Sequence, residues 1–454
     1  MVSQQDGTAG PVAEPDKKTL RKAIAASAIG NATEWFDYGV YAYTATYIGE
    51  AFFPSEDPTA STLGALMVFA ASFLIRPLGG MVWGPLGDRL GRQRVLATTI
   101  LLMAGATFCV GLLPGYATLG IAAPILLILL RMIQGFSTGG EYGGAATFMA
   151  EYAPDKKRGK YGSFLEFGTL AGFTLGALLV LIFQKTLSAE AMGDWGWRLP
   201  FLIAAPLGLI GLYLRSKLED TPVFRELEQK GETAQKTKTQ LRDLGAFWKP
   251  LLLLIGLVVT LNVVNYTLLA YMPTYLEGQI KLSSDDSLIL VIIGQLAMMC
   301  LLPFSGALSD RLGRKTMWWI SIVGLFVLAI PMFKLMGTGF TAAILAFAIL
   351  GLLYVPQLST ISAMFPAMFP THIRYAGFAI AYNVSTAVFG GTAPVINEWL
   401  IGQTGDNIVP AYYMMAACVI GGIALIFTPE TRGASLRGRG VPGVDTLAEP
   451  VGKK

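Results

Sequence analysis

Apolar segments long enough to cross a membrane recur along the whole chain. Of its 454 residues, 53% are hydrophobic and only 14% are charged, whereas an average soluble domain has roughly 25% charged residues. About 20 apolar residues in a helix span a bilayer, and lipid offers no partners to backbone polar groups. We therefore predict an all-α integral membrane protein. Its twelve transmembrane helices are expected near 23–49, 60–85, 94–113, 119–149, 160–184, 198–214, 250–276, 287–307, 316–335, 340–363, 374–401 and 411–428.

The positive charges predict the orientation of these helices. If the N-terminus lies inside, almost all Lys and Arg residues fall on the inner side, as the positive-inside rule requires. The exceptions are two residues within spans and four near the outer face: Arg76 and Arg131, and Lys185, Arg198, Lys281 and Lys334. Both termini are therefore expected in the cytoplasm.

One short motif occurs twice, after the second span of each half of the chain. "GPLGDRLGRQR" occupies 84–94 and "GALSDRLGRKT" occupies 306–316. A weaker echo follows the fourth span of each half, where "APDKKRGKYG" at 153–162 resembles "FPTHIRYAG" at 369–377. The chain is therefore predicted to be an internal duplication.

The duplication divides the chain into two six-helix halves, residues 23–214 and 250–428. The linker 215–249 and the tails 1–22 and 429–454 are expected in the cytoplasm. Two such halves are typical of a secondary transporter, whose substrate site lies near the bilayer midplane between them. The C-terminal tail has no heptads, so no coiled coil is expected there.

The repeated loop resembles the signature "GxLxDRxGRxx" of the major facilitator superfamily, and the resemblance covers nearly the whole chain. "GNATEWFDYGVYAY", "FLIRPLGG", "RMIQGFSTGGEYGGA", "EYAPDKKRGKYGSF" and "DWGWRLPF" are similar to its metabolite–proton symporter branch, which carries small organic acids, shikimate and zwitterionic osmolytes. "PAMFPTHIRYAGFAIAYN", "LLAYMPTYL" and "LGLIGLYLRSKLEDTPVF" most resemble bacterial proline/glycine betaine–proton symporters. The resemblance implies two pseudo-symmetric bundles in the bacterial cytoplasmic membrane that rock about a midplane site, importing a zwitterion with protons.

Two acids and an arginine lie at the depth of the membrane centre. Glu34 and Asp37 are roughly 17–21 Å from the inner end of the first span and share one helix face. Arg131 lies roughly 18 Å deep in the fourth span. Ionisable residues at this depth usually serve function, so we expect Glu34, Asp37 and Arg131 to couple protons; a structural ion pair is the alternative. Arg131 suits either a substrate carboxylate or the role of counter-ion to Asp37 or Glu34. Arg76 lies deeper toward the cytoplasm, so a gating or structural role is expected for it rather than substrate contact.

The acids in the spans outnumber the arginines, which favours a substrate that brings its own positive charge. The acids in question are Glu34, Asp37, Glu141 and Glu166, and the arginines available to neutralise them are Arg76 and Arg131. A substituted ammonium is attracted to aromatic faces, although each aromatic alone is equally explained by packing. The expected substrate-binding residues are Trp35, Tyr38, Tyr41, Arg131, Tyr142, Asn262, Tyr266 and Tyr382.

The repeated inner loops are predicted to form a gate. In the superfamily that they resemble, their charges form a latch between helix ends on the cytoplasmic face. The alternative is ordinary positive-inside topology, but recurrence of the whole motif favours a gate. The expected gating residues are Asp88, Arg89, Arg92, Arg158, Asp310, Arg311, Arg314 and Arg374.

Three rival functions remain open at this point. A proton symporter of a small organic acid, of dicarboxylate or shikimate type, would keep the class and change the substrate. A membrane sensor would be expected to carry a soluble signalling domain, and a membrane enzyme a nucleophile–base pair. Three cysteines in apolar runs and one histidine indicate neither a disulfide framework nor a metal site. We expect no enzyme activity, no cofactor, no metal and no nucleic-acid partner.

Overall fold

The computed structural model describes residues 17–90, 92–216, 245, 247–370 and 373–436, and the regular elements of these residues are all helical. The first half comprises α1 (Lys17–Tyr43), α2 (Ala45–Phe52), α3 (Pro58–Leu74), α4 (Arg76–Leu90), α5 (Arg92–Leu112), α6 (Tyr116–Leu119), α7 (Ala122–Thr138), α8 (Glu141–Tyr152), η1 (Asp155–Lys157), α9 (Arg158–Thr186), α10 (Ala189–Asp194), η2 (Gly196–Arg198) and α11 (Leu199–Ser216). The second half comprises α14 (Trp248–Asn265), η4 (Tyr266–Tyr271), α15 (Met272–Gly278), α16 (Ser284–Leu312), α17 (Arg314–Met336), α18 (Phe340–Leu358), α19 (Ile361–Met364), η5 (Pro366–Met368), α20 (Arg374–Ser385), η6 (Thr386–Gly390), α21 (Thr392–Thr404) and α22 (Val409–Phe427).

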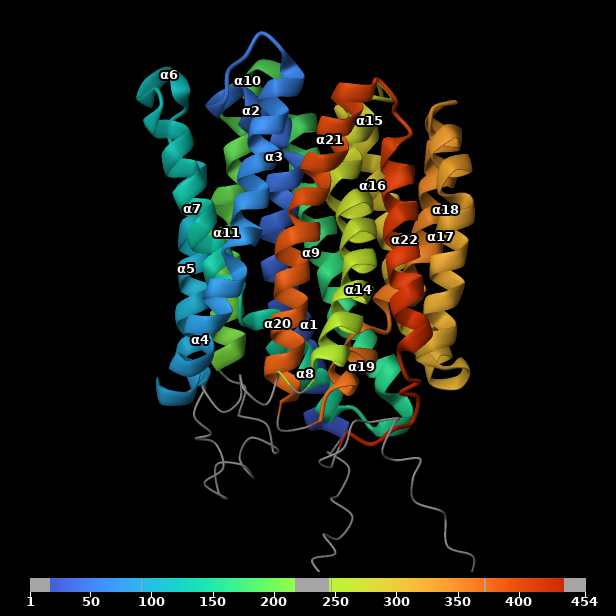
Figure 1. Ribbon diagram of the computed structural model, residues 1–454. Helices are drawn as coiled ribbons and strands as arrows, with labels where there is room; N and C mark the ends of the chain where they lie inside the picture. Colours follow the sequence, from blue (N-terminus) through green and yellow to red (C-terminus); the bar gives the residue numbers. More distant parts are fainter. Residues whose placement is uncertain (1–16, 91, 217–244, 246, 371–372, 437–454) are drawn as a thin grey trace, which may run out of the picture.

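Ten helices in the described part of the chain are long and apolar enough to cross a membrane. The other two expected spans correspond to α1–α2 and α5, which stand in the same bundle (Figure 1). The polar residues of α1 and its break at Thr44 lower its apolar length. In α5 the described side chains run only from Thr98 to Leu112, and this stretch is an apolar helix. The twelve-helix all-α architecture is therefore as predicted.

Large apolar side chains cover the outside of the bundle. Phe304, Val327 and Phe427 are 74%, 61% and 70% exposed, and many other Leu, Ile and Val residues are similarly open. Soluble monomers rarely expose contiguous apolar surface on this scale. The surface therefore suits lipid rather than water.

The two halves stand side by side, with α4, α5 and α7 at one edge of the bundle and α17 and α18 at the other (Figure 1). They meet where α9 packs against α16 and where α3 packs against α21. Within the first half, α1 packs against α9 and α11. The face of α1 that carries Glu34 and Asp37 is therefore enclosed by protein.

Helix irregularities concentrate near the middle of the bundle. The second span breaks at Ile75 between α3 and α4, and the fourth breaks at Gly139 and Gly140 between α7 and α8. Two π-helical turns, η4 and η6, interrupt the seventh and eleventh spans. Such turns are frequent at functional sites, and interrupted helices line the substrate sites of many transporters.

Glycines hold α7 unusually close to α3 and α4. A Cβ atom on Gly135 would overlap the carbonyl oxygen of Ser72, and one on Gly139 would overlap that of Arg76. Small residues allow this approach between membrane helices. The contact brings the C-terminal end of α7 directly against the first residue of α4.

Candidate functional site

Glu34 forms a buried ion pair with Arg76. Nη2 of Arg76 lies 2.5 Å from Oε1 of Glu34, and each side chain is 1% exposed. Nε of Arg76 donates a hydrogen bond to Oγ1 of Thr138 at 3.0 Å, and the hydroxyls of Thr138 and Tyr38 are also 3.0 Å apart. The guanidinium is thus held between α1 and α7.

Glu34 therefore pairs with Arg76 and not with Arg131, and the pairing agrees with the structural role that was one of the two expected for Arg76. Arg76 is the first residue of α4, and helical side chains point toward the N-terminus of their own helix. The second span is expected to run inward, so the side chain extends from Arg76 back toward the membrane centre. The position of Arg76 along its span gives the depth of its backbone but not that of its guanidinium group.

Arg131 occupies a separate place beside Asp37. Its guanidinium carbon lies 4.2 Å from the ring centroid of Tyr41 and 5.5 Å from that of Tyr38. Nη1 donates to Oε1 of Gln134 at 2.7 Å, and Nη2 donates to Oγ of Ser72 at 3.4 Å. The side chain is fully buried, and no hydrogen-bond partner of its Nε is found among the described residues.

Two neutral side chains connect Asp37 with Arg131. Oγ1 of Thr107 donates to Oδ2 of Asp37 at 2.5 Å, and Nε2 of Gln134 donates to the same Thr107 oxygen. Within the described part of the chain, Oδ1 of Asp37 has no hydrogen-bond partner. Sequence reasoning missed Thr107 and Gln134, although a glutamine three residues from an intramembrane arginine was a usable signal.

A small cavity of about 10 Å³ lies between the two halves. It has room for one water molecule at most. Trp35 on α1 and Glu166 on α9 line it from the first half, while Asn262 and Tyr382 line it from the second. The full lining is Trp35, Glu166, Thr169, Leu261, Asn262, Asn265, Tyr354, Leu358, Ile361 and Tyr382. The two halves therefore close around a polar and aromatic centre, which includes three of the expected substrate-binding residues.

The other expected aromatics divide between this cavity and the buried charges. The ring of Tyr142 stacks on that of Tyr382 with their centroids 4.5 Å apart, and the ring centroids of Tyr266 and Trp35 are 6.1 Å apart. Tyr38 and Tyr41 instead lie against the arginines, and the Tyr41 hydroxyl donates to the carbonyl oxygen of Ala65. Neither Tyr38 nor Tyr41 is among the cavity-lining residues.

Charged contacts join the halves at the predicted inner end, which carries α8 and α19 (Figure 1). Oδ1 and Oδ2 of Asp310 accept hydrogen bonds from the backbone N–H groups of Gly159 and Lys160 at 2.9 and 3.0 Å. Nη2 of Arg314 lies 2.7 Å from Asp310, and Nη1 of Arg374 lies 3.1 Å from Glu151 of the first half.

Among the described side chains, the remaining expected gating residues form no ion pair between the two halves. Arg158 pairs with Asp155 in its own half. The side chain of Arg311 is exposed, and its carbonyl oxygen accepts from Arg432. The side chains that the structure describes do not include those of Asp88, Arg89 and Arg92.

The segment after α22 also joins the inner end, which sequence reasoning missed. The carboxylate of Glu430 accepts from the backbone N–H groups of Arg314 and Lys315, both at 3.0 Å. Further along, the carbonyl oxygens of Ala434 and Leu436 accept from Arg158 and Arg374 respectively. The segment after α22 therefore contacts α17 and α20 of the second half and α9 of the first half.

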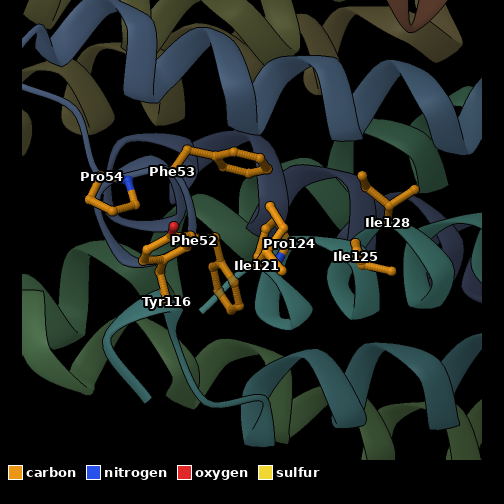
Figure 2. A pocket seen from close by; sticks show the side chains of 8 residues that line it. All are labelled: Phe52, Phe53, Pro54, Tyr116, Ile121, Pro124, Ile125 and Ile128. Atoms are coloured by element: carbon orange, nitrogen blue, oxygen red, sulfur yellow. The ribbon is translucent and has the colours of Figure 1, made fainter. Parts of the chain in front are cut away.

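The predicted outer end is closed by polar contacts that the sequence did not indicate. Lys185 pairs with Asp285 across the halves, and Nε2 of Gln184 donates to Oγ of Ser284 at 2.8 Å. A larger hollow of about 380 Å³ lies at this end within the first half (Figure 2). Its lining of Phe, Ile, Pro and Tyr side chains carries no ionisable carboxylate or amine, so it does not suit a zwitterion.

Comparison with known proteins agrees with this architecture. The model of the Major Facilitator Superfamily matches residues 27–394. The chain is 45% identical over 443 residues to the proline/betaine transporter of Salmonella typhimurium strain LT2, covering 95% of this chain and 88% of the relative. It is 45% identical over 446 residues to the glycine betaine/proline/ectoine/pipecolic acid transporter OusA of Dickeya dadantii strain 3937, covering 96% and 88%.

A solved structure has the same fold at lower sequence identity. The proton:xylose symporter XylE, bound to 6-bromo-6-deoxy-D-glucose, superposes with a TM-score of 0.73 at 19% identity, covering 95% of this chain and 99% of XylE. The twelve-helix bundle, the family match and the relatives, which are matched over most of their length, agree. The chain therefore belongs to the Major Facilitator Superfamily.

Proposed function

We propose that this protein is a proton-coupled symporter that imports a small zwitterionic osmolyte, of proline or glycine betaine type, across the bacterial cytoplasmic membrane. Both termini lie on the cytoplasmic side, and transport proceeds by alternating access. The observation that carries the proposal is the centre of the molecule, where an aromatic and acidic cavity between the halves lies beside buried acid–arginine groups. Relatives of similar length that are named as proline and betaine transporters support the substrate class.

The aromatic residues around the cavity receive the cationic end of the substrate. Trp35 and Tyr382 line the cavity, and Tyr142 and Tyr266 pack directly against them. Aromatic faces attract substituted ammonium groups without requiring N–H donors. Asn262 supplies a polar contact in the same lining.

Arg76 receives the carboxylate end, and Arg131 acts chiefly as the counter-charge of Asp37. The guanidinium of Arg76 lies 5.0 Å from the Phe73 ring, which is itself 5.2 Å from Tyr266. Among the aromatic rings, Arg131 lies nearest to that of Tyr41, at 4.2 Å, and its path to Tyr266 through Phe69 is longer, at 5.8 and 6.2 Å. Neither arginine is among the residues that line the cavity. A substrate carboxylate that engages Arg76 would release Glu34, which links substrate binding to the charge of a buried acid.

Uptake of labelled betaine into proteoliposomes tests the function. An imposed inward proton gradient is expected to drive accumulation, and unlabelled proline is expected to compete. Proteoliposomes without a gradient, and empty liposomes with one, serve as controls. If a dicarboxylate or shikimate competes while proline and betaine do not, the organic-acid alternative holds and the zwitterion proposal is wrong.

The inner contacts act as the gate in this scheme. The expected gating residues Arg158, Arg314 and Arg374 support it together with Asp310, whose carboxylate bonds to two backbone groups of the opposite half. Arg311 remains part of the proposal, as do Asp88, Arg89 and Arg92, which are the counterparts of Asp310, Arg311 and Arg314 in the first copy of the motif.

Asp310→Ala is expected to loosen this gate. Loss of both hydrogen bonds, together worth about 1–2 kcal/mol, raises opening of the inner end about 5- to 30-fold. The measurement is the labelling rate of a cysteine at the buried Ser309 by N-ethylmaleimide, with Cys109, Cys300 and Cys418 replaced by serine. Lys156→Ala is the control, since that exposed side chain lies at the same end and is not among the proposed gating residues. Equal labelling in both variants and the parent contradicts the gate.

A further inference from the structure

Glu166 is a buried acid with no assigned part in proton coupling or gating. It lies on α9, lines the central cavity and is 2% exposed. Oε1 accepts a hydrogen bond from the hydroxyl of Tyr142 at 2.5 Å, and Oε2 accepts from Thr169 at 2.9 Å. No Lys or Arg among the described residues forms an ion pair with it. A buried carboxylate is costly without a cation, so a cation in the cavity would compensate for its charge.

A hydrogen-bonded chain fixes this carboxylate relative to the Trp35 indole. Nε1 of Trp35 donates to Oδ1 of Asn31 at 3.1 Å, and Nδ2 of Asn31 donates to Oγ1 of Thr169 at 2.6 Å. Thr169 in turn donates to Glu166. Groups held in this way need no reorganisation when a ligand arrives, which favours binding.

Aromatic side chains surround the same space. Trp35, Tyr354 and Tyr382 line the cavity with Glu166, and Tyr142 stacks on Tyr382 with an interplanar angle of 18°. The Tyr354 hydroxyl is already engaged, because it donates to Oδ1 of Asn265 at 2.9 Å. The walls therefore offer aromatic faces and one negative charge.

We propose that Glu166 determines specificity by recognising the cationic nitrogen of the substrate, a quaternary or secondary alkylammonium. The inference rests on the proposed function and names the residue that separates zwitterions from organic acids. Both carboxylate oxygens already accept a hydrogen bond from a protein hydroxyl, so the ligand need not supply N–H groups. Methyl groups on the nitrogen can lie on the aromatic faces while the charge lies beside the carboxylate. A dicarboxylate or shikimate brings no cation and is repelled by Glu166.

The test uses glycine betaine and its uncharged-head isostere, 3,3-dimethylbutanoate, which has carbon in place of nitrogen. Full-length wild type in proteoliposomes is expected to bind betaine and to reject the isostere. Glu166→Gln is expected to lose about 10-fold or more of its betaine affinity and most of its preference over the isostere. Glu166→Asp, which keeps the charge, is expected to retain that preference.

Glu398→Gln is the matched control. Glu398 is also buried, and its Oε2 accepts from the hydroxyl of Tyr271 at 2.5 Å, but it does not line the cavity. This variant should bind betaine as wild type does. Thermal unfolding of each variant checks folding, and Glu166→Ser is measured as a second neutral replacement in case the glutamine variant does not fold.

The outcomes separate this inference from the function on which it rests. Unchanged betaine affinity and preference in the folded neutral variants overturn the role of Glu166 alone. Loss of proton-driven uptake with unchanged betaine affinity would identify Glu166 as a proton carrier, which also overturns it. If wild type binds neither betaine nor proline, the proposed function fails and this inference fails with it.

Discussion

Asp37→Asn is expected to abolish proton-driven accumulation of substrate. With one proton per substrate, each pH unit of gradient supports about 10-fold accumulation, because a tenfold ratio corresponds to about 1.4 kcal/mol. The variant should reach only the external concentration, while exchange of substrate across the membrane continues. Labelled betaine uptake under an imposed pH gradient measures both.

The local geometry favours Asp37 over Glu34 as the proton carrier. Glu34 has a direct cation in Arg76, whereas Asp37 reaches Arg131 only through Thr107 and Gln134. The Thr107 hydroxyl lies within reach of both Asp37 and the carbonyl oxygen of Met103, at 2.5 and 2.9 Å. It can donate to a charged Asp37, or turn to Met103 when a protonated Asp37 donates to it. Asp37 can therefore form a hydrogen bond with Thr107 in both its charged and its protonated state.

Glu56→Gln is the control for this prediction, because Glu56 is an exposed acid in the loop before α3. It should accumulate substrate as wild type does. Full accumulation by a folded Asp37→Asn variant would remove Asp37 from the coupling role and leave Glu34 as the candidate.

Arg76→Met is expected to destabilise the protein by about 3–5 kcal/mol, since removal of one partner leaves a buried charge uncompensated. The double variant Glu34→Gln, Arg76→Met should recover most of this loss, because the remaining groups are neutral. It should still not transport, because Arg76 is proposed to hold the substrate carboxylate. Thermal unfolding in detergent and betaine uptake give the two readouts.

The outer ion pair provides the matched comparison. Lys185 and Asp285 are 57% and 30% exposed, and pairs in such a setting contribute about 1 kcal/mol or less. Lys185→Met should therefore change stability little. A stable Arg76→Met variant, or a double variant no more stable than the single one, would show that the buried pair is not a structural link between α1 and α4.

Much of the site was predictable as a set of residues but not as a set of contacts. Trp35, Asn262 and Tyr382 do line the central cavity, and Asp310 and Arg374 do contact the opposite half. Asparagine and tyrosine in apolar segments signal a polar interior, whatever their neighbours are. Glu166 was visible as an acid in a span, but its position beside Trp35 depends on how α1 and α9 face each other.

The sequence by itself determined the twelve helices, the repeated motif and which charged residues lie within apolar segments, because apolar length and spacing along a helix are local properties of the chain. Only the tertiary structure decided that Glu34 meets Arg76, that Thr107 and Gln134 connect Asp37 with Arg131, and that the segment after α22 contacts both halves. Such pairings depend on which helices are neighbours, on the rotation of each helix about its axis, and on the direction in which long side chains extend. None of these is specified by the position of a residue along its own span.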